Sequence, residues 1–127
     1  MPTAVAPRVE YEDRFRARPE LMTAAEAALA YLDGRLGTNP LVPPPSVIRW
    51  ALRPLDPNAV ELSMADEADG LRAAEVFPAQ QLADPRIRDI RAIRVWGDLL
   101  SERSRVNQRR IDEKFSAYLR SLDEGTE

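Results

Sequence analysis

The chain has 127 residues, of which 44% are hydrophobic, 31% charged and only 6% aromatic, and its formal net charge is −3. This composition is typical of one small globular domain with a core of Leu, Ile, Val and Ala. Because the sequence lacks cysteine and histidine and has a single lysine, Lys114, it excludes disulfides, thiol nucleophiles, Ser-His-Asp triads and imidazole acid–base chemistry. We expect neither a metal nor a cofactor, and no enzymatic activity.

Basic residues are concentrated late in the chain. Residues 84–120 hold ten basic against six acidic side chains, whereas residues 1–83 are net acidic and the last seven residues add three acids. Interspersed charges of both signs usually form a solvated helix face.

The N-terminus shows no cationic start followed by an apolar run, and no segment approaches the ~18–20 apolar residues of a membrane span. We therefore expect a cytoplasmic protein that does not enter a membrane.

The first elements are ambiguous. Residues 9–17 alternate between apolar and charged side chains, as in a half-exposed strand, but Tyr11 and Phe15 are also four apart, as on a helix. Both interpretations stay open, and residues 1–18 are expected at the periphery of the domain.

A helix is predicted over residues 24–36. Thr23 and Glu26 fit a capping box at its start, and Gly34 and Gly37 are candidate terminators. Its apolar positions follow the spacing of one buried face: Ala25, Ala28, Leu29, Leu32 and Leu36. Residues 37–46, which include three successive prolines, predict a stiff extended connector.

A β-hairpin follows, because two segments alternate between apolar and polar residues on either side of a turn over residues 54–58. Matching the two apolar sets places Leu52 opposite Leu62, Trp50 opposite Met64, and Arg53 opposite Glu61 on the outer face.

An acidic turn ends this hairpin, and Arg72 to Phe77 can return as a third strand. Asp66, Glu67 and Asp69 carry carboxylates that divalent cations bind. They lack the ligand spacing of a calcium loop, so we interpret the segment as a solvated turn.

The remainder is helical, with Asp84 as N-cap and Pro85 at the first helical position. An unbroken helix to Leu122 would span about 57 Å, whereas a compact domain of this length is only about 36 Å across. Either the helix breaks, for instance at Gly97, or its end leaves the domain. A short strand over residues 91–96 is a less favoured local alternative.

Projection at 100° per residue puts the large apolar side chains of this region on one arc: Ile90, Ile93, Leu100, Ile111, Phe115, Tyr118, Leu119 and Leu122. Within that arc, residues 101–110 are polar. This gap predicts that residues 87–100 complete the core while residues 111–122 pack elsewhere. A bend near residues 101–107, which would fold the last helix back onto the same core, is the open alternative.

The densest basic cluster, Arg103, Arg105, Arg109 and Arg110, lies in this gap and could contact phosphates. Arg103 and Arg110 project in one direction, however, and Arg105 and Arg109 in nearly the opposite one, so a single helix does not present them as one face.

The sequence thus predicts a single α+β domain over residues 1–127, with one helix, a short antiparallel meander of two or three strands, and a long C-terminal helix or helical pair. As function we expect a non-enzymatic interaction or assembly module. It would self-associate, giving a homo-oligomer, or dock on a protein partner through Ile111, Phe115, Tyr118, Leu119 and Leu122. The alternative is a nucleic-acid-binding accessory protein that uses the arginines of residues 103–110.

Overall fold

The computed structural model describes residues 7–36 and 44–124, so most of the expected proline connector lies outside the described residues. Four strands form one mixed sheet in the order β1-β2-β3-β4, in which only the β1–β2 pair is parallel. The fold is therefore α+β, with four strands rather than two or three. In chain order the elements are β1 (Arg8–Tyr11), α1 (Asp13–Arg16), α2 (Pro19–Leu36), β2 (Val47–Arg53), β3 (Asp56–Asp66), β4 (Leu71–Pro78), the 3-10 helix η1 (Ala79–Ala83) and α3 (Pro85–Glu124).

The ambiguous segment 9–17 contains both a strand and a helix. Its alternating part becomes β1, and Glu12 then caps α1 by accepting a hydrogen bond from the backbone amide of Arg14 at 2.9 Å. Phe15 of α1 is fully buried against Trp50, with 5.8 Å between the ring centroids. Residues 8–16 thus supply the edge strand β1 and, through Phe15, part of the core.

Helix α2 begins at Pro19, five residues earlier than predicted, so the capping box at Thr23 is wrong. Proline is well suited to the first helical turn because it has no amide hydrogen to leave unpaired. The earlier start adds Leu21 to the buried stripe, which runs through Leu21, Ala25, Ala28 and Leu32. Gly34 lies inside the helix, and Gly37 lies outside the described residues.

The predicted hairpin exists, but its register differs by two residues. Trp50 pairs with Leu62, because the turn is only Pro54–Leu55 and the register then shifts at an irregularity between Leu52 and Arg53. A shift of two keeps every side chain on its predicted face. The expected ion pair survives as a diagonal contact, with 2.7 Å between Arg53 Nη1 and Glu61 Oε2, and Arg72 Nη2 lies 3.1 Å from the other oxygen of Glu61. The third strand is confirmed as β4.

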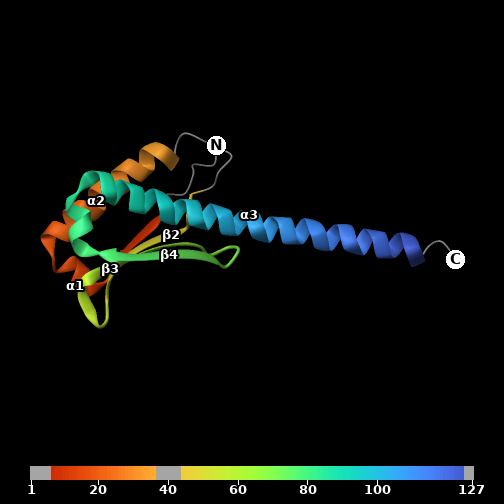
Figure 1. Cartoon of the computed structure of the whole chain (residues 1–127), viewed down its shortest axis with the longest axis horizontal. Coiled ribbons are helices and arrows are strands. Elements are labelled where there is room, and N and C mark those ends of the chain that lie inside the picture. Colours follow the sequence, from red (N-terminus) through yellow and green to blue (C-terminus); the bar gives the residue numbers. More distant parts are fainter. Residues whose placement is uncertain (1–6, 37–43, 125–127) are drawn as a thin grey trace.

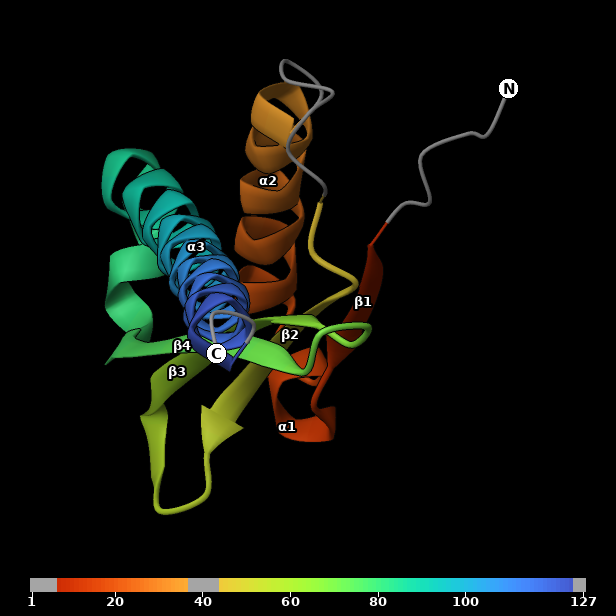
Figure 2. The same cartoon turned by 90° about the vertical axis from the view of Figure 1, so that its right-hand side faces the viewer.

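The core lies between one face of the sheet and the two long helices. Figure 2 shows α2 and α3 side by side over the same face of the sheet. The apolar side chains of β2 and β3 point toward them, and the buried set includes Ile48, Trp50, Leu52, Val60, Leu62 and Met64.

Helix α3 runs unbroken for 40 residues, or about 60 Å, and its last third projects away from the rest of the molecule (Figure 1). Asp84 caps it as predicted, since its Oδ1 accepts the Arg86 amide at 3.0 Å. Gly97 does not interrupt it, and the strand over residues 91–96 and the backward bend are both wrong. Among the described residues, no helix combines the length and apolar composition that a membrane crossing requires.

Candidate functional site

The first part of α3 packs on the body through a different face than predicted. Ala92, Val95 and Leu99 are fully buried, whereas Ile90 is 58% exposed. The buried stripe continues through Arg103 and Val106, which are half-buried. The projection from the sequence followed the largest apolar side chains, but the face that packs on the sheet and α2 sets the small Ala92 and Val95 beside Leu99, and the small side chains permit a close approach of the helix.

Between residues 107 and 123 the helix has no buried side chain. Every residue from 107 to 123 is exposed, and we call residues 107–124 the arm. The stretch predicted to be polar, residues 101–110, spans the point where the arm begins. Its four uncharged polar residues are all exposed: Ser101, Ser104, Asn107 and Gln108. The arm is therefore held by its base alone.

One side of the arm carries the predicted apolar cluster. Four of its members follow 4,3,4 spacing, which places them on one helix face. Their exposed fractions are 58% for Ile111, 60% for Phe115, 60% for Tyr118, 45% for Leu119 and 47% for Leu122. We call these five residues the apolar face of the arm.

An ion pair with the β3–β4 turn anchors the base of the arm. Arg103 Nη2 lies 2.7 Å from Asp66 Oδ2, and the two side chains are only 14% and 12% exposed. Asp66 Oδ1 also accepts the backbone amides of Ala68 and Asp69. The hydrogen bond from Arg103 lowers the pKa of Asp66 against the opposing effect of burial, and the two amides add to the lowering.

The acidic segment is a solvated turn as predicted over residues 67–70, which are all exposed, but Asp66 departs from that interpretation. Asp66 is buried, and Gly70 makes the turn possible by adopting a φ of +68°. Asp69 remains exposed and lies 3.8 Å from Arg110. A carboxylate at the end of a strand whose partner is an arginine 37 residues later gives no local signal, so no sequence pattern predicts the pair.

The arginine cluster is divided, as the projection predicted. Arg103 and Arg110 both face the acidic turn, and Arg105 Nη1 lies 3.3 Å from Glu102 of the preceding helical turn. Arg109 is exposed. Two of the four guanidinium groups therefore have carboxylate neighbours on the body, and the cluster forms no continuous basic surface.

A second buried ion pair joins α3 to the sheet. Glu75 of β4 lies on the core-facing side of its strand and contacts Arg91. The Nε of Arg91 donates a hydrogen bond to Gln81 at 3.0 Å, and its guanidinium lies 5.6 Å from the centroid of the Phe77 ring. The position of Glu75 two residues before Phe77, on the same face of β4, was the only sequence signal for this contact.

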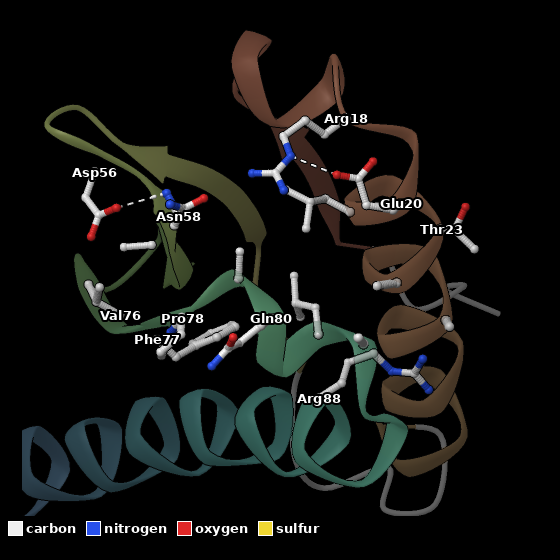
Figure 3. A pocket seen from close by; sticks show the side chains of 17 residues that line it. Arg18, Glu20, Thr23, Asp56, Asn58, Val76, Phe77, Pro78, Gln80 and Arg88 are labelled. Atoms are coloured by element: carbon white, nitrogen blue, oxygen red, sulfur yellow. Dashed lines mark hydrogen bonds and ion pairs between the residues drawn. The ribbon is translucent and has the colours of Figure 1, made fainter.

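A hollow of about 940 Å³ lies between α2, η1 and the ends of β3 and β4 (Figure 3). Its charged groups already have neighbours, since Arg18 pairs with Glu20 at 2.8 Å and Arg88 with Asp89 at 3.1 Å. Asp56 accepts the backbone amide of Asn58 at 3.0 Å. The rest of the lining is mainly apolar, including Leu21, Phe77 and Leu82. No local sequence pattern indicates this hollow, which arises where these four elements meet.

Comparisons with known proteins add no constraint: no protein-family model matches the chain, and neither a curated protein nor a solved structure gives a match.

Proposed function

We propose that this chain is a non-enzymatic protein-interaction module in which the folded body holds out the arm as a docking element. The observation that supports this most directly is the apolar face of the arm. Five large apolar side chains, each about half exposed, lie together on a helix that has left its own core. Clustered apolar surface of this kind marks a contact site, because its burial is favourable and its exposure promotes aggregation.

The mechanism follows from how the arm is held. The arm has about five helical turns, and a free helix of that length is only marginally stable in water. Its first residues are nucleated by the packed part of α3 and steadied by the Arg103–Asp66 pair. A partner that covers the apolar face would bury side chains and keep the arm helical at the same time. The body thus holds the first residues of the arm in a helix, and a bound partner would stabilise the helix along the remaining residues.

The non-enzymatic part of the proposal is supported by the roles of three buried or half-buried carboxylates. Glu12, Asp66 and Glu75 each accept hydrogen bonds from arginine side chains that hold elements together. These groups stabilise the fold, and reactive carboxylates would instead face a cleft.

Site-specific photocrosslinking in cells tests the proposal. A photoreactive phenylalanine analogue replaces Tyr118 on the apolar face or, as a matched control, Glu113, which is also exposed, on the opposite side of the same helix. We expect protein adducts at position 118 and far fewer at position 113. Equal yields at the two positions, or no adduct at either, would overturn the proposal.

A paired substitution tests the same surface in solution. Phe115→Asp should reduce the assembly of the purified protein at least tenfold, whereas Ala117→Asp, two residues away on the other side of the arm, should leave it unchanged. The two variants share the same added charge, and the control carries the larger helix-propensity penalty because alanine is the best helix former. A common response of the two variants would therefore contradict a role for the apolar face. Light scattering at two protein concentrations measures the assembly.

A further inference from the structure

We infer that the apolar face of the arm docks on the same face of a second copy, with the two arms antiparallel. The inference rests on the proposed function and adds to it the identity and the direction of the partner. It starts from the 4,3,4 spacing of Ile111, Phe115, Tyr118 and Leu122, which is the seam of a two-helix coiled coil.

One antiparallel alignment buries all four seam residues. It pairs Ile111 with the partner's Leu122 and Phe115 with the partner's Tyr118, and the two-fold axis repeats both pairs. Moving one arm by a heptad toward the base would instead place polar Gln108 and Ser104 against the partner's Tyr118 and the partner's Leu122. A polar residue in the seam lowers stability, so the register is set by the residues themselves.

The charge along the arm favours the antiparallel direction. Arg109 and Arg110 are the first charged residues of the arm. Its last charged residues, Asp123 and Glu124, are acidic. In the antiparallel alignment the acidic tip of each arm lies level with the basic base of the other arm. In a parallel pair, the acidic tips would lie side by side and so would the arginines, and like charges at such distances repel.

The placement of the bodies also favours this direction. The arms meet at a point between residues 116 and 117, near the middle of the exposed stretch 107–123. An antiparallel pair therefore puts the two folded bodies at opposite ends, where each arm tip reaches the base of the other arm. A parallel pair would bring both bodies to the same end.

The seam covers only about 16 Å of helix. An interface of this size is at the lower end of those found in specific complexes, so we expect a reversible dimer with a dissociation constant in the micromolar range. Association should accordingly depend on protein concentration.

Spin-label distances test the direction. Because the chain has no cysteine, a single cysteine in place of exposed Ser104 or exposed Ser116 can be labelled specifically. In the antiparallel dimer, the backbone positions at residue 104 are about 38 Å apart along the axis, whereas those at residue 116 are nearly level and separated by roughly one interhelical distance of about 10 Å. We expect a long distance for Ser104→Cys and a short one for Ser116→Cys.

The other outcomes are distinguishable. Short distances at both positions would show a parallel pair, which overturns the inference and leaves the proposed docking function intact. No dipolar coupling at about 500 µM, together with crosslinks from position 118 to a different protein, would also overturn only the inference. No coupling and no crosslink would overturn both. Circular dichroism of each labelled protein verifies that α3 has remained helical.

Discussion

Two parts of one helix can be compared directly in this molecule. Residues 92–106 and the arm, residues 107–124, have the same backbone conformation, but the first part is packed on the body and the second is exposed on all sides. The packed part uses small side chains such as Ala92 and Val95 at its contact face, whereas the arm carries the bulky Phe115 and Tyr118. The size of an apolar side chain therefore does not identify the core-facing side of a helix. The neighbouring elements decide it.

The largest expected effect comes from the same substitution in the two parts. Leu99→Ala should lower the free energy of unfolding by about 3 kcal/mol or more, because Leu99 is 1% exposed and its removal leaves a cavity. Leu122→Ala should change it by less than about 0.5 kcal/mol in dilute solution, where the arm has no partner. Urea denaturation monitored by circular dichroism measures both values. Equal losses would show that the arm packs on its own body in solution.

An intermediate effect is expected where the two parts join. Asp66→Asn should cost about 2 kcal/mol, because it leaves the Arg103 guanidinium facing a neutral amide in a nearly buried site. Asp69→Asn is the matched control in the same turn. Asp69 is exposed and 3.8 Å from Arg110, so its loss should cost less than about 1 kcal/mol. A similar cost for both variants in urea denaturation would place the anchor elsewhere.

The stability difference between the wild type and Asp66→Asn should also depend on pH. Arg103 lowers the pKa of Asp66 in the folded state, so the contribution of this carboxylate is fully present above its unfolded pKa of about 4 and is lost as the pH falls through the folded pKa. The stability difference between the wild type and Asp66→Asn should therefore shrink below about pH 4. Glu12 should behave alike: burial opposes the shift, but hydrogen bonds from Arg14 and from the Leu52 amide lower its pKa to about 2. A difference that stays constant down to pH 2.5 would contradict this role of Asp66.

The smallest expected effect concerns the arginines around the junction. Because Arg103 and Arg110 face the acidic turn and Arg105 pairs with Glu102, DNA binding at physiological salt should be no tighter than about 10⁻⁶ M. Arg109→Ala should leave it unchanged within a factor of about two to three. Fluorescence anisotropy with single-stranded and duplex DNA measures this. Nanomolar affinity that disappears in Arg109→Ala would restore the nucleic-acid hypothesis in place of protein docking.

Much of the fold could be predicted from local patterns. The strand β4, the faces of β2 and β3, and the cap at Asp84 all followed from alternation or capping chemistry, which depends on residues within a few positions of each other. Even the register error at Trp50 preserved the faces, because it was a shift of two. The five residues of the arm's apolar face were also identified from their spacing and are exposed together on one helix.

What the sequence could not supply were contacts between distant segments. The parallel β1–β2 pair, the Asp66–Arg103 anchor and the Glu75–Arg91 contact join residues that lie 16 to 39 positions apart, and no local pattern encodes such a meeting. The sequence by itself determined that α3 is a helix with an apolar face near its end. Only the tertiary structure decided that the helix continues past Gly97 and leaves the body, because the sheet and α2 are covered by the stripe through Ala92, Val95 and Leu99. That stripe ends at Val106, and every residue from 107 to 123 is exposed beyond the contact of α3 with the sheet and α2.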